Sequence, residues 1–277
     1  MSIKKAVKMI PGVTTVRNLQ LAFKAPLNVI CESHKKIRSY KNKYLGKRCF
    51  VVGNGPSLTA SDLDLIKNEI SFAANTIYKI FPMTEWRPTF YCVQDENVLR
   101  DIVKDDLKTE TEACEAAFIR MYSSRIVREE GLDLNNIIYV PIWSRIKKNY
   151  SAPFSKRADR FVYDGSMVTY LSLQLAVFMG FSEIYLIGMD HNFPFHRKRN
   201  GEIEENDKSI PVHFWESADK NTGNIDLHSN YHELAENSYR EVARVSKKCG
   251  TFKVYNATRG GKLEVFERVN LDDIVRG

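Results

Sequence analysis

The chain has 277 residues, of which 43% are hydrophobic and 27% are charged, and its formal net charge is +7. This length suits one large α/β domain or two small ones, and the composition is that of a globular protein, which excludes disorder over the whole chain. No apolar run reaches the roughly 18 residues that a membrane-spanning helix needs. The basic start of the chain also lacks the apolar stretch of a secretory signal, so a cytoplasmic protein is expected.

Residues 1–47 are predicted to form a basic, partly helical lead-in, broken at Pro11 and Pro26. Its basic side chains alternate with Val29, Ile30 and Ile37. Two interpretations remain open, namely a solvated face and a peripheral contact with the inner face of a membrane. Nucleic acid is not expected as a partner, because aromatic residues are not interleaved with the basic ones.

From Arg48 onward, short apolar runs alternate with helical segments. This alternation predicts right-handed βαβ units and a doubly wound, mostly parallel sheet of the Rossmann-like α/β class, in one domain over residues 48–277. The predicted strands cover 49–52, 71–74, 89–93, 117–121, 137–142, 183–187 and 252–255, and the two clearest helices cover 166–179 and 232–247.

Polar residues recur just past the predicted strand ends. In an open parallel sheet, ligands bind outside the carboxyl ends of the strands. We therefore favour a ligand-binding role for this set, against the alternative that Asn and Asp are simply good turn formers. The set is Asn54, Asn75, Asp95, Asp190 and Asn256.

The sharpest local pattern is the turn Gly53-Asn54-Gly55-Pro56-Ser57 between a strand and a helix. Its glycines allow a tight turn and close approach of a ligand, and Pro56 is suited to open the helix, whose free N–H groups would face a phosphate. It is neither a Walker A motif nor a dinucleotide fingerprint. Gly165-Ser166 resembles a second anion-facing helix start, with ordinary capping as the alternative.

No site for a metal is expected. The five cysteines include no pair at CxxC spacing. Asp62 and Asp64 fall inside a predicted helix and are interpreted as surface residues, so no carboxylate pair follows a strand. The polar segment 192–230 is expected to be a lid over the site. His228 and His232 lie four residues apart, and a general base is a better use for them than zinc.

Taken together, these residues resemble a known group. The run from Lys47 to Leu58 is similar to the opening of the bacterial sialyltransferases of the Campylobacter lipooligosaccharide type. It resembles equally the wider family of flagellin-modifying motility accessory factors and MptE-like hydroxymethylpterin diphosphokinases. The runs from Gly165 to Ala176 and from Gly180 to Asp190 resemble the second shared block, and His228-Ser229 resembles the segment that carries the sialyltransferase base.

The resemblance implies a GT-A-variant fold and a metal-independent, inverting transfer from a CMP-activated nonulosonic acid to a hydroxyl, without a cofactor. His228 would be the base, with His232 as the second candidate. The residues that the resemblance assigns to the nucleotide and donor are Gly53, Asn54, Gly55, Ser57, Asn75, Gln94 or Asp95, Gly165, Ser166 and Asp190. Asn192 stands where the sialyltransferases carry a tyrosine that assists the leaving phosphate, which puts sialic acid itself in doubt.

Three functions follow as hypotheses. The leading one is a glycosyltransferase that uses a nucleotide-sugar donor and a glycan or glycolipid acceptor in surface polysaccharide or lipooligosaccharide synthesis. The second is an MptE-like diphosphokinase that uses ATP and Mg²⁺, with Asp95 and Asp190 available to the metal. The third is a non-enzymatic nucleotide-sugar-binding assembly protein. The sequence leaves the oligomeric state open, a homo-oligomer included.

Overall fold

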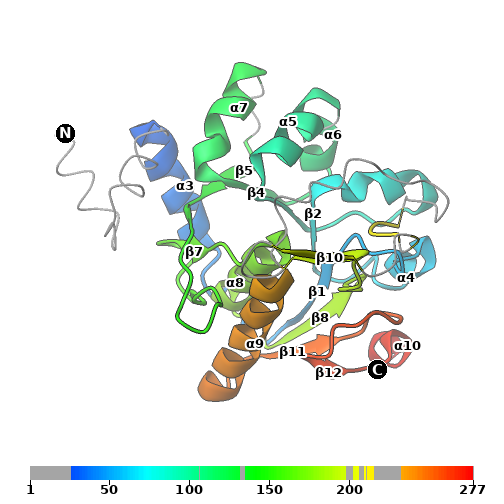
Figure 1. Ribbon diagram of the computed structural model, residues 1–277. Helices are drawn as coiled ribbons and strands as arrows, with labels where there is room; N and C mark the ends of the chain where they lie inside the picture. Colours follow the sequence, from blue (N-terminus) through cyan, green and yellow to red (C-terminus); the bar gives the residue numbers. More distant parts are fainter. Residues whose placement is uncertain are drawn as a thin grey trace.

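The computed structural model describes residues 26–105, 107–131, 135–197, 202–205, 209, 211–214 and 232–276. The strands of its main sheet are β1 (Arg48–Val52), β2 (Ser71–Ala74), β3 (Phe90–Val93), β4 (Ala116–Arg120), β5 (Ile137–Val140), β8 (Glu183–Ile187), β11 (Lys253–Asn256) and β12 (Glu267–Arg268). They form an eight-stranded sheet in the order β12-β11-β8-β1-β2-β3-β4-β5 (Figure 1). Each neighbouring pair is parallel, which confirms the predicted fold class.

The central strands are buried along their length, as the continuous apolar runs predict. Every residue of β2, β3 and β5 is buried. Successive side chains of β1 enter different cores, with Val51 on one face of the sheet and Phe50 and Val52 on the other. A strand that is buried on both faces needs helices on both faces, which is the doubly wound arrangement.

The helices divide between the two faces of the sheet. Their bounds are α3 (Leu27–Ser39), α4 (Ala60–Leu65), α5 (Glu96–Asp105), α6 (Leu107–Glu112), α7 (Ser124–Glu129), α8 (Val168–Met179), α9 (His232–Cys249) and α10 (Leu271–Arg276), with 3-10 turns η1 (Asn75–Met83) and η2 (Met121–Ser123). One core takes side chains from α8 and α9, and the other takes them from α4, α5, α6, α7 and α10. The almost wholly apolar α8 is buried against β1, β2 and β3, which explains why its sequence lacks a polar face.

The strand order reverses between β1 and β8, in the middle of the sheet (Figure 1). The chain runs outward from β1 to β5, then returns to β8 and continues outward on the other side to β12. Ligands of open α/β sheets bind in the crevice at such a switch point, outside the carboxyl ends of the strands. The topology therefore predicts a ligand site at the loops that follow β1 and β8.

The described part of the basic lead-in packs on the domain. Helix α3 lies against β5, and Ile37 is only 2% exposed within the core. Val29 and Ile30 are partly buried against the same domain. The apolar residues that were open to a membrane contact thus face the protein. Within the part of the chain that the structure describes, no helix is both long enough and apolar enough to cross a membrane.

The helix after the first turn begins at Ala60. Its N-cap is Thr59, which forms a capping box with Asp62, so Pro56 does not open it. The interpretation of Asp62 as a surface residue is wrong. Its carboxylate is buried and forms an ion pair with Arg259 at 2.6 Å, because the C-terminal segment packs beside α4.

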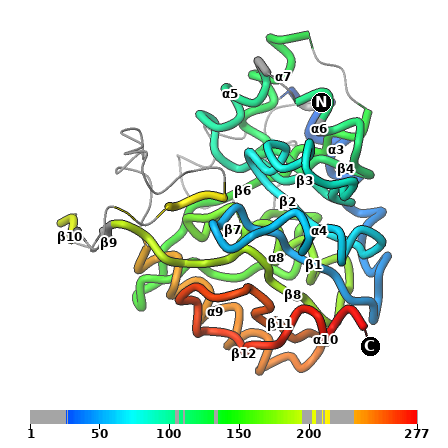
Figure 2. Tube along the Cα trace, turned by 90° about the vertical axis from the view of Figure 1, so that its right-hand side faces the viewer, coloured from blue at the N-terminus to red at the C-terminus, as the bar shows by residue number. Residues whose placement is uncertain are grey.

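The predicted lid contains a short antiparallel hairpin of β9 (Phe195–Arg197) and β10 (Ile203–Glu205). These strands extend from the body of the molecule, on the side opposite the C-terminus (Figure 2). A further two-stranded sheet joins β6 (Ile142–Trp143) to β7 (Val162–Tyr163), just before Asp164. Residues 1–25 and, in or next to the predicted lid, residues 198–201, 206–208, 210 and 215–231, which include His228, lie outside the described residues.

Candidate functional site

The turn after β1 is bound to the end of β8 rather than left open. The amide of Gly53 donates to the carbonyl of Ile187 at 2.8 Å, and the amide of Gly55 donates to the carbonyl of Gly188 at 2.9 Å. The amide of Ser57 donates to Oδ2 of Asp190 at 3.3 Å. These amides, which the sequence offered as phosphate donors, are thus already engaged by the neighbouring loop.

The two glycines of the turn are required by this close packing. A Cβ on Gly53 would lie 2.3 Å from the carbonyl oxygen of Gly188, and a Cβ on Gly55 would lie 2.0 Å from Oδ2 of Asp190. Neither distance is compatible with a side chain. The glycine pattern therefore permits the approach of two protein loops at the switch point, in addition to any approach of a ligand.

Asp190 links the two loops at the switch point. Its Oδ2 accepts a hydrogen bond from Oγ of Ser57 at 2.8 Å, and its backbone oxygen accepts one from the amide of Lys262 at 2.6 Å. Burial raises the pKa of the Asp190 carboxyl, and the two hydrogen bonds from Ser57 oppose this shift. The following residue, His191, has a left-handed backbone with φ of 48°.

Three side-chain amides end the neighbouring strands and share one feature. The oxygen atoms Oδ1 of Asn54, Oδ1 of Asn75 and Oε1 of Gln94 are buried and have no hydrogen-bond partner. Nδ2 of Asn54 donates to the carbonyl of Ala74 at 3.1 Å, which orients its oxygen as an acceptor. A buried acceptor without a partner costs about 1–3 kcal/mol. The strand ends therefore present acceptors suited to hydroxyl or amino donors of a ligand.

Two members of the predicted polar set have structural uses. Oδ1 of Asp95 accepts the amides of Asn97 and Val98 at the start of α5, and its residue is exposed. Asn256 is buried, donates to the carbonyl of Leu263 at 2.8 Å and accepts the amide of Thr258. Between the two candidates at the end of β3, Gln94 is the one with an unsatisfied buried oxygen.

Gly165 and Ser166 are positioned by the residue before them. Gly165 is buried against the ring of Tyr170. Ser166 is partly exposed, has a φ of 64°, and donates its amide to Oδ1 of Asp164 at 2.8 Å. Because α8 begins only at Val168, with Met167 as its N-cap, this pair forms a turn ahead of the helix.

The second candidate base is covered. His232 is only 4% exposed, and its ring lies on the ring of Phe193 with centroids 4.0 Å apart. Asn192 is partly exposed. From the predicted lid, the amide of Phe214 donates to the carbonyl of Asn54 at 3.0 Å, so this part of the segment does lie on the turn.

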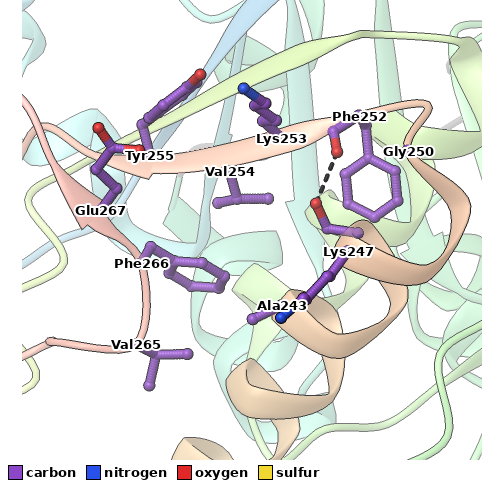
Figure 3. Close-up of a pocket in the computed structure, with 11 residues that line it drawn as sticks. Ala243, Lys247, Gly250, Phe252, Lys253, Val254, Tyr255, Val265, Phe266 and Glu267 are labelled. Carbon is purple, nitrogen blue, oxygen red and sulfur yellow. Dashed lines mark hydrogen bonds between the residues drawn. The ribbon is translucent and has the colours of Figure 1, made fainter.

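A cavity of about 330 Å³ lies elsewhere, between α9 and the strands β11 and β12. Val254 and Phe266 point into it, and Lys247 and Lys253 are among its lining residues (Figure 3). Lys253 is the first residue of β11, so the cavity lies apart from the carboxyl ends of β1, β2 and β3. Among the described residues, no group of three or more His, Cys, Asp or Glu side chains is arranged to hold a metal ion.

The family model described as "6-hydroxymethylpterin diphosphokinase MptE-like" matches residues 24–195. This match covers more than half of the 277 residues and includes the turn, the amides of the strand ends, and Asp190. The chain belongs to the MptE-like family. No curated protein matches the chain.

Two solved structures resemble this MptE-like chain. The first, the MAf glycosyltransferase from Magnetospirillum magneticum AMB-1, has a TM-score of 0.50 and 16% identity over 92% of this chain. This chain spans only 40% of that protein's chain. The second is the sialyltransferase CstII from Campylobacter jejuni in complex with a substrate analogue, cytidine-5′-monophosphate, with a TM-score of 0.42, 14% identity, and coverage of 81% of this chain and 85% of that one. The first likeness supports the fold of the MptE-like chain.

The structure also brings together residues that the sequence did not single out. Asp164 accepts hydrogen bonds from Gln94 and Ser166, and Arg120 lies 3.9 Å from it. The strand prediction of 117–121 made Arg120 an interior residue, whereas β4 ends at Arg120. A charged residue at the end of an apolar strand was the available signal.

Proposed function

We propose that the chain is a nucleotide-dependent glycosyltransferase that moves a nonulosonic-acid-type sugar from a CMP-activated donor to a glycan hydroxyl. The observation that carries this proposal is the row of buried, unpaired amide oxygens on Asn54, Asn75 and Gln94 beside the switch point. Ribose hydroxyls, sugar hydroxyls and the amino group of cytosine are donors that complement these acceptors. The fold shared with a structure described as a glycosyltransferase supports the reaction class.

In this proposal, the nucleotide lies over the loops that follow β1 and β8. Asn54, Ser57 and Asp190 border that position, and Gly53 and Gly55 hold the two loops close enough together to form it. Because Ser57 and the turn amides are engaged by β8, charge on the phosphate needs further donors. The Nδ2 group of Asn192 and the basic residues of the predicted lid are the candidates that the sequence provides.

The reaction proposed is a single inverting displacement without a metal or cofactor. His228 takes the proton of the acceptor hydroxyl, the acceptor oxygen bonds to the anomeric carbon, and the bond from that carbon to the phosphate oxygen breaks to release CMP. A positioned histidine base contributes about 10²–10⁴-fold to such a reaction. We assign the base to His228 because the ring of His232 is buried and in contact with the ring of Phe193.

The acceptor proposed is a glycan or glycolipid in surface polysaccharide or lipooligosaccharide synthesis, reached from the cytoplasmic side. A peripheral membrane contact in this proposal is electrostatic, through basic residues such as Lys35 and Lys41, since Ile37 is buried in the protein core. A homo-oligomer and the absence of nucleic-acid binding belong to the same proposal.

Isothermal titration of the purified chain with CMP, UDP and ATP plus Mg²⁺, with and without EDTA, tests the donor class. We expect micromolar binding of CMP that survives EDTA, with UDP and ATP weak. Metal-dependent binding of ATP with no binding of CMP would overturn the proposal. The His228→Ala variant should keep its affinity for CMP and lose transfer activity. Unchanged transfer activity in the variant would overturn the assignment of His228 as the base, and absence of transfer by the wild type, with CMP binding intact, would indicate a non-enzymatic nucleotide-sugar-binding protein.

The second candidate function is a 6-hydroxymethylpterin diphosphokinase, which the description of the family favours. That reaction uses ATP and carboxylates that hold Mg²⁺. The carboxylates expected to serve it fit poorly. Oδ1 of Asp95 caps α5, and Oδ2 of Asp190 already accepts hydrogen bonds from both the amide and the hydroxyl of Ser57. This misfit is why we place the glycosyltransferase first.

A further inference from the structure

Residues 142–163, which run from β6 to β7 and are called the β6–β7 segment below, hold much of the positive charge of the chain. The segment contains six Lys and Arg residues and one Asp, a net charge of +5 in a chain whose formal net charge is +7. Among these cations, Lys147 and Arg157 form ion pairs with described residues, Glu241 and Asp159. The other cations are exposed and have no ion pair with a described residue, and they are Arg145, Lys148, Lys156 and Arg160.

An aliphatic side chain stands among these charges. Ile146 is 55% exposed and lies between Arg145 and Lys147 in the chain. The turn that carries it is held by its own contacts. The amide of Lys147 donates to the carbonyl of Ser151 at 2.8 Å, and Nζ of Lys147 pairs with Glu241 of α9 at 3.0 Å. The exposure of Ile146 is therefore a property of a fixed turn, which presents apolar surface and positive charge together.

Three aromatic residues of the segment pack on other rings. The ring of Phe161 stacks on that of Trp143 with centroids 4.2 Å apart, and Phe154 contacts the rings of Tyr170 and Phe252. A basic surface that binds single-stranded nucleic acid needs aromatic faces on which the bases stack. A basic surface whose rings are engaged in this way, and whose exposed apolar side chain is aliphatic, is better suited to anionic lipid headgroups.

The β6–β7 segment begins and ends at the candidate site. Oγ of Ser144, the residue after β6, lies 3.4 Å from Oδ2 of Asp164, the residue after β7. Asp164 accepts a hydrogen bond from Nε2 of Gln94, whose Oε1 is one of the unpaired acceptors. Ile146 is two residues beyond Ser144, so their Cα atoms are at most about 7 Å apart. A lipid surface in contact with Ile146 would thus lie beside the carboxyl edge of the sheet.

The same surface reaches the basic turn after α3. The pKa of the Asp159 carboxyl lies below its usual range, first because Arg157 donates to both of its oxygens and, to a lesser degree, because the charge of Lys41 is near. Lys41 is one of the residues through which the proposed function places an electrostatic membrane contact. The β6–β7 segment therefore extends that contact toward the candidate site and adds an apolar side chain to it.

We propose that the β6–β7 segment is a docking surface for an anionic lipid bilayer, with Ile146 inserted between the headgroups and with Arg145 and Lys148 on their phosphates. The inference rests on the proposed function in one respect, because a glycolipid acceptor gives a reason for the site to face a bilayer. The surface itself needs no donor. Lipid binding and CMP binding can therefore be measured separately.

Sedimentation of the purified chain with vesicles tests the proposal. The probes are vesicles of phosphatidylcholine alone and of phosphatidylcholine and phosphatidylglycerol in equal parts. We expect binding to the anionic vesicles that weakens as salt is raised, and no binding to phosphatidylcholine. Ile146→Ser should lower the affinity about 5- to 10-fold, because the exposed part of the side chain no longer leaves water. Arg145→Gln combined with Lys148→Gln should lower it about 25-fold, about fivefold for each charge.

Fluorescence distinguishes insertion from attraction by charge alone. In the Ile146→Trp variant, addition of anionic vesicles should shift the tryptophan emission to shorter wavelength by more than in wild type, because the introduced indole enters the bilayer. An emission that does not change beyond the wild-type response would contradict insertion. Urea unfolding of each variant should match wild type, as expected for exposed positions, so a change in lipid binding is not a loss of the fold.

Two matched controls belong to elements that pack in the other core, away from α8 and α9. Met83→Ser removes an apolar side chain that is 60% exposed, and Arg125→Gln removes the charge of a side chain that is 74% exposed. Both should bind vesicles as wild type does. An equal loss of affinity in the controls, unchanged binding by Ile146→Ser, or failure of the wild type to bind anionic vesicles would overturn the inference.

Polyuridylate is a further probe, since binding of this RNA in place of vesicles would make the segment a nucleic-acid surface and would also overturn the inference. Titration with CMP on the same samples keeps the two proposals apart. Lipid binding without CMP binding would remove the proposed function and leave the docking surface. CMP binding without lipid binding would remove the docking surface and leave the proposed function.

Discussion

At the scale of single residues, the turn after β1 requires glycine because the loop after β8 packs directly against it, which the sequence pattern does not indicate. Gly55 faces Oδ2 of Asp190, and Asp190 binds Ser57 across a separation of 133 residues in the chain. The same atoms therefore join the two halves of the sheet and border the candidate site. Substitutions there should affect stability and binding together.

Gly55→Ala should lower the free energy of unfolding by about 1–3 kcal/mol, because its Cβ overlaps Asp190 and the carbonyl of Gly188. CMP affinity should fall with it. Gly250→Ala is the control for CMP affinity: a Cβ there meets nothing within 4 Å, so the strain of its φ of 64° lowers stability while affinity should stay unchanged. Urea unfolding and titration with CMP measure both effects. If the Gly55→Ala variant unfolds at the same urea concentration as wild type, the loops after β1 and β8 can move apart without a loss of stability.

The buried carboxyl of Asp190 predicts a pH dependence. Its pKa is raised in the folded chain because burial disfavours the charged form, while in the unfolded chain it is about 3.9. The stability that this group contributes is therefore complete below pH about 4 and declines as pH rises through the folded-state pKa. Asp190→Asn lacks this decline, so its stability relative to wild type should increase from pH 4 toward neutrality. Urea unfolding across that range measures it, and parallel pH profiles for the two proteins would contradict the assignment.

At the scale of elements, the short helix α4 is stabilised by its own residues. Thr59 accepts the amide of Asp62, and Asp62 accepts the amide of Thr59 while pairing with Arg259. The turn before it is held by β8. The start of α4 and the conformation of the turn are therefore separable, although the sequence suggested that a single strand–turn–helix unit binds the phosphate.

Thr59→Ala should lower the free energy of unfolding by about 1 kcal/mol, through loss of the N-cap. Affinity for CMP should stay within error of wild type, because no hydrogen bond from Thr59 reaches the turn residues at 53–57. Ser61→Ala, one residue inside the same helix and exposed, should change neither quantity. A drop in CMP affinity on replacing Thr59 would indicate that the first amides of α4 bind the phosphate.

At the scale of the whole molecule, the basic residues after Pro26 belong to the domain. Helix α3 and the turns that follow it attach to the sheet through Ile37, Tyr40 and Tyr44, which join the same core as α8. Lys43 and Arg48 are paired with Glu115 and Glu69. Part of the positive charge thus stabilises contacts between elements and is not available to an anionic surface.

Ile37→Ala should lower the free energy of unfolding by about 2–5 kcal/mol, the cost of a cavity in a packed core. Leu45→Ala, in the same segment but 73% exposed, should stay within about 0.5 kcal/mol of wild type. Thermal and urea unfolding provide the measurements. Equal stability of the two variants would show that α3 does not contribute to the core of the domain.

The sequence by itself determined the class of fold, and it predicted a candidate site at the carboxyl edge of the sheet. Short apolar runs such as Cys49–Val52 predict buried strands, because each residue of the run is in the core. Asn54 and Asp190 follow closely after two such runs in the sequence, so the ends of these strands can be predicted as well. Only the tertiary structure decided which polar residues remain free. Asp95 caps α5 and Asn256 binds Leu263, whereas Asn54, Asn75 and Gln94 keep unpaired oxygens. The physical reason is that hydrogen-bond partners come from loops distant in sequence, as Gln94 and Asp164 do across 70 residues, and no local pattern records such a pairing.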